Sequence, residues 1–497
     1  MAVFYNEGEQ KIRPGVYQRH VNTNVTVSTE AQDGICAIPI KASWGPLGKV
    51  VKNTNALQLE QNYGSGTYGT GYTVPAAAAM FAGGAATVYT YRLGTGGTAG
   101  TKQITTGLTA TAKYPGTMPI SVAVQNKIGY SSVKQFLVYA GTTQVESFEF
   151  DAHAPGAEEN TVPEGANLVA AAADSNYVTV TASGSAVNVV PILEVASGAL
   201  TGGTNPTVSN ADYSAAFTAL EPYYYNTIAL DVNDDSTLTL SLLLQEYLDN
   251  AYKYGKLGIA VVGEPTTVAF ETRLAHAKAF NDAKVVYLGG GWMNGTTSND
   301  GVLSICYTAG VIAATPSNLG ITHSVITGAT NLCESLTYSQ YEDAIIAGML
   351  MVSMSPDGSI WYDSGIDTLT TPEEGTQDEG WKKIRRVKVR FELIDRLDRA
   401  LAPKVGKVSA DTDGVSDIVQ AGQRVLDLMA NNEGKLQVGA SFTEDPDLPF
   451  TTDSAWFIIR ADDVDSLEKI YLQYQFRYSQ SGPTSARIPR AIPGSRL

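Results

Sequence analysis

Three short apolar runs decide the fold of this 497-residue chain: NTIALD at residues 226–231, GIAVVG at 258–263 and KVVYL at 284–288. Two segments with helical spacing of apolar residues, Leu238–Tyr252 and Thr267–Asn281, separate these runs. Strands that are apolar on both faces and alternate with helices are typical of a parallel sheet covered on both sides. The stretch therefore predicts an α/β middle domain, with further helices at Ser304–Ala314 and Gln340–Ser353.

The residues before the middle domain divide into an arm and a compact part. In residues 1–22, Pro14 and Gly15 exclude a helix and leave Val16–Val21 extended. This arm contains few apolar residues that could be buried locally, so we expect it to pair with something else. Four elements are predicted in residues 23–94: strands at Val25–Val27 and Ile35–Ile40, a proline-initiated helix at Pro75–Phe81 and a strand at Thr87–Leu93.

A change of composition after Gly94 marks an insertion. Residues 95–195 are rich in Gly, Ala, Thr, Ser and Val, and no arginine occurs between Arg92 and Arg273. Short β-type runs separated by Gly, Pro and Asn turns are typical of a β-sandwich. The runs lie at Ile120–Gln125, Gln135–Ala140 and Tyr177–Ala182. We expect a sandwich on the periphery of the fold.

The C-terminal third carries a basic region on an acidic chain, whose formal net charge is −16. Residues 381–407 contain ten basic and three acidic residues. Glu392–Arg396 and Asp395–Arg399 have i,i+4 helical spacing, and such pairs stabilise a helix by only about 0.3–0.5 kcal/mol each. The basic residues before them are expected to face an acidic partner surface. These residues, called the basic strip below, are Lys382, Lys383, Arg385, Arg386, Lys388 and Arg390.

After the basic strip come further predicted elements and then a tail that cannot form its own core. An amphipathic helix is predicted at Asp413–Met429, a buried strand at Ala455–Ile459 and an alternating strand at Ile470–Tyr478. The tail beyond contains prolines and arginines but no acidic residue. Because unpaired strand edges aggregate, we expect both terminal arms to join sheets shared between subunits. The residues proposed for these contacts are Pro14, Gly15, Val16, Tyr17, Ile470, Leu472, Tyr474 and Phe476.

The sequence contains no complete pattern for catalysis or cofactor binding. Neither a Gly-x-x-x-x-Gly-Lys-[Ser/Thr] loop nor a Gly-x-Ser-x-Gly elbow occurs. The pattern Asp231-x-Asn233-x-Asp235 resembles a calcium loop but lacks the glycine and glutamate that follow in such loops. Paired acidic residues, Asp462-Asp463 among them, lie in polar turns and are interpreted as solvated charge. We predict no catalytic residue, no metal ligand and no cofactor.

Composition argues against several other classes. Cys36, Cys306 and Cys333 form no CxxC pattern, so we expect buried, reduced thiols. The excess of acidic residues disfavours nucleic-acid binding. The first residues lack the features of a secretory signal, and the apolar run Ala344–Val352 is about half the ~20 residues of a membrane span. We expect a soluble protein in a reducing compartment.

Five motifs, spread over almost the whole chain, occur in this order: KIRPGVY at 11–17, FAGGA at 81–85 before VYTYRL at 88–93, AKYPGT at 112–117, LTGGT at 200–204 and DSLEKIY at 465–471. Their sequence and order resemble those of contractile tail sheath proteins from myophages and phage-tail-like bacteriocins, especially in Gram-positive prophages. Each motif alone is weak, and their shared order carries the resemblance.

The resemblance implies a structural subunit that polymerises as stacked hexameric discs around a tail tube and contracts to drive that tube through a bacterial envelope. It implies a subtilisin-like but non-catalytic middle domain and no enzyme activity. The implied partners are other copies, the tail tube, the baseplate and the tail terminator, with no nucleic acid and no membrane contact. Assembly would occur in the host bacterial cytoplasm, and the basic strip would face the tube or a neighbouring subunit.

The expected segments are an N-terminal arm at 1–22, the first part of the sheath core at 23–94, the sandwich at 95–195, the α/β middle domain at 196–370, an α+β domain at 371–478 and a tail at 479–497. Two other classes remain open: an α/β hydrolase-like enzyme with an accessory sandwich, and a surface-layer or adhesin protein. The lack of an acid/base constellation argues against the enzyme, and the lack of a signal sequence argues against the adhesin.

Overall fold

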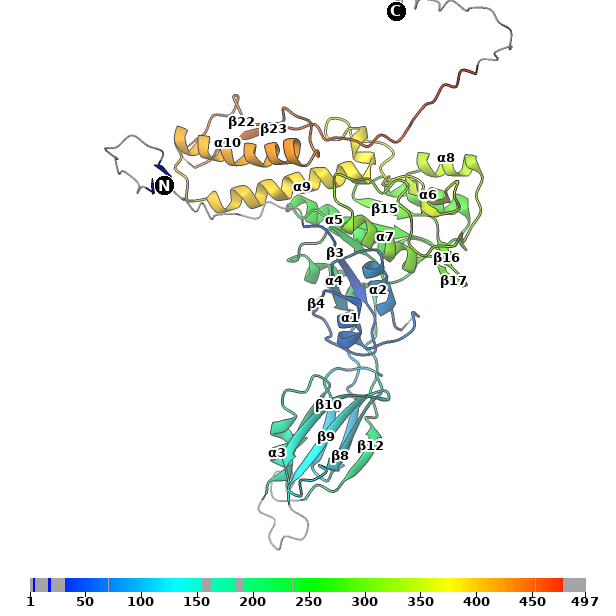
Figure 1. Ribbon diagram of the computed structural model, residues 1–497, viewed down its shortest axis with the longest axis vertical. Helices are drawn as coiled ribbons and strands as arrows, with labels where there is room; N and C mark the ends of the chain where they lie inside the picture. Colours follow the sequence, from blue (N-terminus) through cyan, green and yellow to red (C-terminus); the bar gives the residue numbers. More distant parts are fainter. Residues whose placement is uncertain are drawn as a thin grey trace, which may run out of the picture. The chain divides into compact units, whose positions relative to one another are not determined.

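The computed structural model describes residues 3–4, 17–18, 32–69, 71–153, 162–184, 191–234, 236–451 and 453–476. The chain divides into two units, residues 1–465 and 466–497, and each is described by itself. The first unit contains an α/β domain, a β-sandwich and a C-terminal α+β domain (Figure 1). The predicted mixed, multi-domain fold is confirmed.

A seven-stranded sheet forms the centre of the α/β domain, in the order β19-β15-β14-β13-β3-β5-β4. Its strands are parallel except for β4 at one edge. They are β3 (Ile35–Ile40), β4 (Val50–Asn53), β5 (Thr87–Arg92), β13 (Thr227–Ala229), β14 (Ile259–Gly263), β15 (Val285–Leu288) and β19 (Met349–Leu350). The three apolar runs that predicted the sheet are β13, β14 and β15, and every residue of these strands is buried.

Helices cover both faces of this sheet. One face packs against α1, α2 and α7, and the other packs against α4, α5 and α6. The helices of this domain are α1 (Ala56–Tyr63), α2 (Val74–Ala82), α4 (Asn210–Leu220), α5 (Thr239–Lys253), α6 (Phe270–Phe280), α7 (Val302–Ala314) and α8 (Tyr338–Ile346). A small antiparallel sheet follows β15 and consists of β16 (Trp292–Asn294), β17 (Thr297–Asn299) and β18 (Asn331–Leu332).

The crossing of α2 and α7 leaves room only for glycine. A Cβ added at Gly310 would lie 2.1 Å from the Met80 carbonyl oxygen, and one added at Gly83 would lie 2.1 Å from the Tyr307 carbonyl oxygen. Both distances are far inside van der Waals contact. Gly83, which the sequence marks as a helix end, is therefore also a packing residue.

The helix predicted at Gln340–Ser353 is wrong in its second half. After α8 the chain enters the edge strand β19 and then β20 (Val352–Met354), which pairs with β21 (Ile360–Tyr362). Gly348 separates the two parts with a φ of +73°, and a Cβ there would lie 2.9 Å from the Asp367 carbonyl oxygen. A left-handed glycine commonly ends a helix. The apolar run after Gly348 belongs to a buried strand, which periodicity alone cannot distinguish from a buried helix.

Residues 101–199 form the predicted two-sheet sandwich. One sheet has the order β10-β9-β8-β12, and the other has the order β11-β7-β6. The strands are β6 (Thr101–Thr105), β7 (Leu108–Ala112), β8 (Ile120–Asn126), β9 (Val133–Ala140), β10 (Thr143–Asp151), β11 (Val178–Ala182) and β12 (Val195–Ala199). A separate apolar core fills the space between the sheets, and α3 (Glu164–Ala171), which was not predicted, packs beside β10 and β11.

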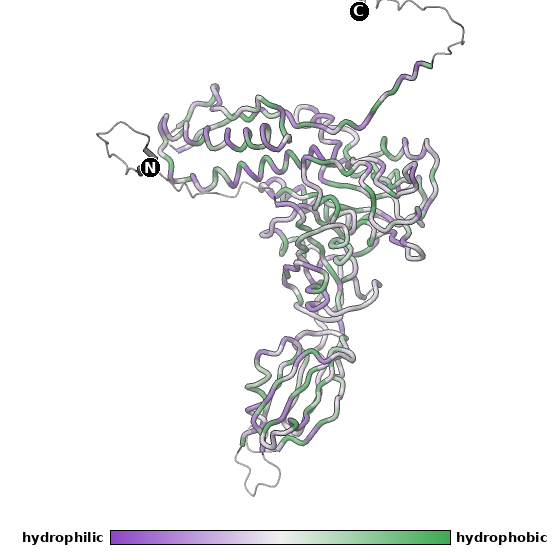
Figure 2. Tube along the Cα trace, viewed as in Figure 1, coloured by the Kyte–Doolittle hydropathy of each residue, from purple (hydrophilic) through white to green (hydrophobic). Residues whose placement is uncertain are grey.

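The C-terminal domain packs α9 (Ile384–Leu401) against α10 (Thr412–Asp427) and a hairpin of β22 (Ser441–Glu444) and β23 (Phe457–Arg460). Figure 2 shows apolar and polar residues alternating along both helices, as in helices that bury one face. The predicted amphipathic helix is thus confirmed. The strand predicted at Ala455–Ile459 is present as β23 but is not buried, because Ile459 is 45% exposed on a hairpin that packs by one face.

The two predicted arms are described only in part. At the N-terminus, β1 (Val3–Phe4) pairs in parallel with β2 (Tyr17–Gln18), while Pro14, Gly15, Val16 and the strand predicted at Val25–Val27 lie outside the described residues. In the second unit, residues 470–476 form no strand within this chain, and the predicted pairing between subunits stays a prediction. Alternation supplies two faces, but a strand also needs a hydrogen-bonded partner. Arg477 and Tyr478 lie outside the described residues.

Candidate assembly site

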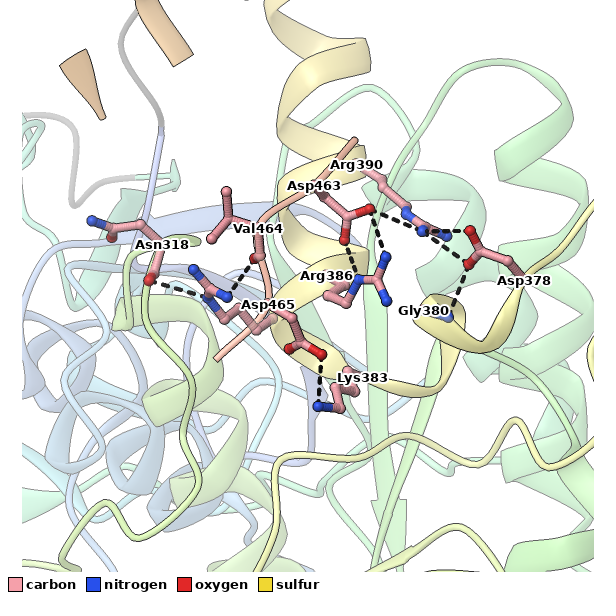
Figure 3. A network of polar contacts seen from close by, with 10 residues as sticks. Asn318, Asp378, Gly380, Lys383, Arg386, Arg390, Asp463, Val464 and Asp465 are labelled. Atoms are coloured by element: carbon pink, nitrogen blue, oxygen red, sulfur yellow. Dashed lines mark hydrogen bonds and ion pairs between the residues drawn. The ribbon is translucent and has the colours of Figure 1, made fainter. Parts of the chain in front are cut away.

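The last residues of the first unit, 462–465, lie along the beginning of α9 and are called the clamp segment below (Figure 3). Two backbone hydrogen bonds attach this segment to the loop after α10. The Val464 amide donates to the Lys435 carbonyl at 3.0 Å, and the Gln437 amide donates to the Asp462 carbonyl at 2.7 Å. The backbone thus fixes the segment, and its side chains meet the basic residues of α9.

Asp463 binds two arginines that lie one helical turn apart. The Arg386 guanidinium donates to both carboxylate oxygens, and Arg390 Nη2 donates to Asp463 Oδ1 at 3.0 Å. The Asp463 side chain is only 6% exposed. Burial alone would raise the pKa of Asp463, but the hydrogen bonds from Arg386 and Arg390 outweigh it and hold the pKa below its usual value. The carboxylate is therefore ionised and strongly bound.

Two further contacts complete the clamp. Lys383 Nζ lies 2.8 Å from Asp465 Oδ2, next to the first residue of the second unit. Arg385 donates to the Val464 carbonyl and, at 3.1 Å, to the Asn318 carbonyl of the α/β domain (Figure 3). The clamp therefore joins the clamp segment to both α9 and the α/β domain.

A second, buried network anchors α9 to the α/β domain. Lys388 Nζ donates to the Ile312 carbonyl at 2.6 Å and to the Thr315 carbonyl, at the C-terminal end of α7. Cations are favoured at this end of a helix because its carbonyl groups are unpaired. Burial lowers the pKa of Lys388 to about 8. One turn further along α9, Glu392 accepts hydrogen bonds from Ser317 and, at 2.7 Å, from Lys435.

These contacts correct the interpretation of the basic strip. Its six cations were expected to remain free for a partner, but all six bind groups of their own chain. Lys382 pairs with Glu379 at 2.7 Å, and the other five make the contacts described above. The two predicted helical pairs, Glu392–Arg396 and Asp395–Arg399, are present. The strip holds the C-terminal segment in place and is not an unoccupied basic surface.

The proposed arm residues are not brought to this site by the described structure. Ile470, Leu472, Tyr474 and Phe476 are 69–92% exposed within the second unit. The rings of Tyr474 and Phe476 are near parallel, with centroids 6.1 Å apart, as expected for side chains on one face of an extended segment. An apolar face of this kind thus begins a few residues after the clamp.

The residues considered for chemistry have structural roles. Asp231 is fully buried, accepts a hydrogen bond from Tyr213 at 2.6 Å and one from Thr73 at 2.5 Å, and has a pKa raised by burial. Asn233 accepts a hydrogen bond from the amide of Val302, at the start of α7, at 3.0 Å. In the described part of the chain, no group of three His, Cys, Asp or Glu residues could hold a metal ion.

The remaining expectations are confirmed in part. Cys36 and Cys306 are buried and unbridged, as predicted, whereas Cys333 is only half-buried. His276 of α6 is half-buried and lies with its Nδ1 2.7 Å from Glu264 Oε2. No helix in the described ranges is both long and apolar enough to cross a membrane.

Asp463 and Asp465 are the functional residues that the sequence interpretation missed. The pair Asp462-Asp463 was interpreted as solvated charge because paired acids in polar turns usually are. A usable signal was present: the acidic cluster of residues 462–468 and the basic strip are opposite charge runs of similar length. Matching the two runs would have suggested that they neutralise each other.

Comparison with known proteins identifies the family. A model of the phage tail sheath protein β-sandwich domain matches residues 95–205, and a model of the phage tail sheath protein central domain matches residues 207–363. The chain belongs to the phage tail sheath family. It is therefore a sheath protein of the kind found in phage tails and contractile injection systems.

Individual relatives of this sheath protein match over most of its length. The uncharacterized protein YqbK of Bacillus subtilis (strain 168) is 24% identical over 499 residues, which cover 95% of this chain and 99% of YqbK. The crystal structure of a sheath tail protein from Desulfitobacterium hafniense has a TM-score of 0.70 at 20% identity, covering 92% of this chain and 99% of the other. The helical sheath of the anti-feeding prophage, in its contracted state, has a TM-score of 0.52 at 12% identity over 94% of this chain and 99% of that one. The two solved structures share the fold of this sheath chain.

Proposed function

We propose that this chain is the subunit of a contractile tail sheath, in which copies form stacked hexameric discs around a tail tube and the assembly shortens to drive the tube through a bacterial envelope. The observation that carries the proposal is the clamp segment, held through Asp463 and Asp465, followed a few residues later by the exposed apolar face of Ile470–Phe476. Family membership and the fold shared with a contracted sheath support it.

Contraction requires subunits to stay linked while their bodies move. A segment that adds as a strand to a neighbour forms main-chain hydrogen bonds, which tolerate movement of the body if the link is extended. The same link transmits force to the point where it leaves the body. The clamp suits this task, because pulling Asp463 from Arg386 and Arg390 would leave charges buried without partners, which is costly.

The hairpin of β22 and β23 is the acceptor we propose for such a strand. Within the described residues this sheet has two strands. On β22 the outward Phe442 amide already donates to Gln423 Oε1 of α10 at 2.9 Å, so the outer edge of β23 is the one that offers unpaired backbone groups. Trp456 and Ile459 are 40% and 45% exposed beside it. The apolar face of Ile470, Leu472, Tyr474 and Phe476 from another copy would cover these side chains. We propose that the N-terminal arm, with Pro14, Gly15, Val16 and Tyr17, adds to the same sheet.

The finer parts of the functional assignment are proposals as well. We propose that the middle domain is subtilisin-like without catalysis, that the protein is not an enzyme, and that the domain boundaries are those expected from the sequence. The proposed partners are further copies, the tail tube, the baseplate and the tail terminator, and the proposed site of assembly is the host cytoplasm before incorporation into a particle. The buried, hydrogen-bonded state of Asp231 supports the non-catalytic assignment, because it occupies the end of a central strand where active sites often lie.

Negative-stain electron microscopy of the purified full chain tests this proposal. We expect sleeves or tubes with regular transverse striations, in which averaged end views show six subunits. A variant lacking residues 1–20 should remain folded and monomeric, because it retains the body but lacks one linking arm. Ordered sleeves from that variant, or a wild-type chain that stays monomeric at high concentration, would contradict the proposal.

A further inference from the structure

A pocket of about 110 Å³ lies beside the second half of α9. Two of the segments that line it come just before β13 and β14 in the chain. Three segments contribute to its walls: the run Glu221–Tyr225, the loop Gly255–Gly258, and α9 through Asp395 and Asp398. Its floor is buried, and a Cβ added at Gly258 would lie 2.7 Å from the Tyr225 ring. Tyr223 and Asp398 are exposed at its rim, so the pocket is open to an incoming side chain.

Aromatic rings form one side of this pocket. Tyr223, Tyr224 and Tyr225 are consecutive in the chain and all line it. Hydrogen bonds hold two of these rings: the Tyr225 hydroxyl donates to the Tyr247 hydroxyl at 3.0 Å, and the Tyr224 hydroxyl accepts from Asn226 at 3.2 Å. A tyrosine face carries negative potential and attracts cations, most often the guanidinium of arginine. The rings thus offer a prearranged surface for a positively charged group.

Carboxylates also line the pocket, and their charge is not fully neutralised within the described residues. Asp395 pairs with Arg399, whereas no ion pair is formed there by Asp398 or Glu221. Burial raises the pKa of Asp395, and the nearby charge of Asp398 raises it further. Lys256 is the basic residue among those that line the pocket. The pocket therefore has an excess of negative charge beside aromatic rings.

We propose that this pocket binds an arginine side chain from the C-terminal tail of a second copy of the chain. The tail supplies complementary charge: residues 469–497 contain five basic residues and no acidic residue. Arginine is the cation that can bind both the tyrosines and the carboxylates, since its planar guanidinium stacks on aromatic rings and donates hydrogen bonds to carboxylates. The inference rests on the proposed function, because it needs copies of the chain side by side.

The length of the tail is sufficient for a contact between copies. Residues 477–497 lie beyond the described structure and would span roughly 70 Å when extended, at about 3.3–3.6 Å per residue. Arg487, Arg490 and Arg496 are distributed along this length. The pocket would thus fix the end of a tail whose earlier residues add to the neighbour as a strand. It would give the link between copies a second, charge-dependent contact.

Sedimentation analysis of self-association tests the pocket. The variant E221Q/D398N removes the two carboxylates that form no ion pair and keeps their shape, and we expect self-association to weaken about five- to ten-fold at physiological salt. The matched control E271Q/E342Q neutralises two exposed acids on α6 and α8 and should leave self-association unchanged. The variant R487A/R490A/R496A should weaken self-association as E221Q/D398N does. Combining the two sets should cause little further loss, because they remove the same contact.

Mixing the two variants decides whether the contact is between copies. One chain has an intact pocket and an altered tail, and the other has an altered pocket and an intact tail. Their mixture should associate more strongly than either chain does alone, because one pocket can bind the other chain's tail. Additive losses in the combined variant, or no recovery on mixing, would overturn the proposal, and the latter would place the tail in the pocket of its own chain. If E221Q/D398N forms normal sleeves while a variant altered at Leu472 and Phe476 does not, the pocket proposal fails and the sheath proposal stands.

Discussion

Arg386, in the first turn of α9, and Asp463, near the end of the first unit, form a half-buried ion pair across 77 residues of sequence. Arg390 binds the same carboxylate at 3.0 Å. Lys388 lies on the same helix and bonds the end of α7. A pull on the clamp segment is therefore passed to α9 and from there to the helix that packs on the central sheet.

We expect Asp463→Ala to be strongly destabilising. The substitution leaves Arg386 without its anion and removes one of the two anions of Arg390, and leaving such half-buried charged groups unpaired costs about 1–3 kcal/mol. Urea unfolding followed by circular dichroism measures the change. Asp465→Ala is the matched control, since its more exposed pair with Lys383 contributes about 0–1 kcal/mol. Equal effects of the two variants would show that the clamp is not centred on Asp463.

The clamp should also make stability depend on pH in the acid range. Burial alone would raise the pKa values of Asp463 and Glu433, but hydrogen bonds from their basic partners hold both below the usual range. A depressed folded-state pKa means that the ionised group contributes stability above the unfolded value of about 4, which is lost as pH falls through the folded value. Melting temperatures should therefore fall below about pH 4.

The variant Asp463→Asn supplies the control for this pH dependence. Because it cannot ionise at this position, its melting temperature should change less steeply below pH 4 than that of the wild type. An unchanged slope would mean that other carboxylates account for the acid sensitivity.

The close crossing of α2 and α7 gives a prediction for glycine. Gly310→Ala places a methyl group where only 2.1 Å separates it from the Met80 carbonyl oxygen, so the helices must move apart. We expect a loss of about 1–3 kcal/mol in the free energy of unfolding, measured in urea. Gly71→Ala is the control, because a Cβ there meets no atom within 4 Å. A loss of the same size in the control would contradict the role assigned to this close packing.

The insertion should be removable, because its two ends meet. The Thr95 amide donates to the Thr207 carbonyl at 3.0 Å, and Thr98 pairs with Thr204. A chain in which a short glycine linker replaces residues 98–204 should keep the α/β body folded, with some loss of stability where Trp44 no longer stacks on Tyr177. Circular dichroism and a cooperative urea transition provide the test. Complete loss of soluble protein would place the sandwich within the folding core.

Local patterns predicted the elements well but not their partners. The runs at β13, β14 and β15 could be recognised because short, continuously apolar runs between helices are typical of a covered parallel sheet. The end of α8 could not, because the apolar run after the left-handed Gly348 fits a buried helix as well as a buried strand, and its pairing with β15 is set by another segment of the chain. The same limit accounts for the error over the basic strip, since Arg386 and Asp463 meet only in the folded chain.

That error changes an expectation about charge reversal. A basic strip that only faces a partner predicts that replacing Lys382, Lys383, Arg385 and Arg386 with glutamate leaves folding intact and disturbs only the assembly. In the structure these replacements would place carboxylates against Asp463, Asp465 and two backbone carbonyls. We now expect the reversed variant to be unstable as a monomer, which thermal unfolding before any assembly step would reveal. A stable monomer would contradict the role of the clamp.

The central claim is that copies of this chain are linked through the apolar face that follows the clamp. The most direct test compares Leu472→Asp/Phe476→Asp with Gln473→Asp/Gln475→Asp, which introduce the same charge on opposite faces of the same exposed segment. Electron microscopy of both proteins at matched concentration should show folded monomers for the first variant and striated sleeves for the second. Sleeves of normal order from Leu472→Asp/Phe476→Asp would contradict the account.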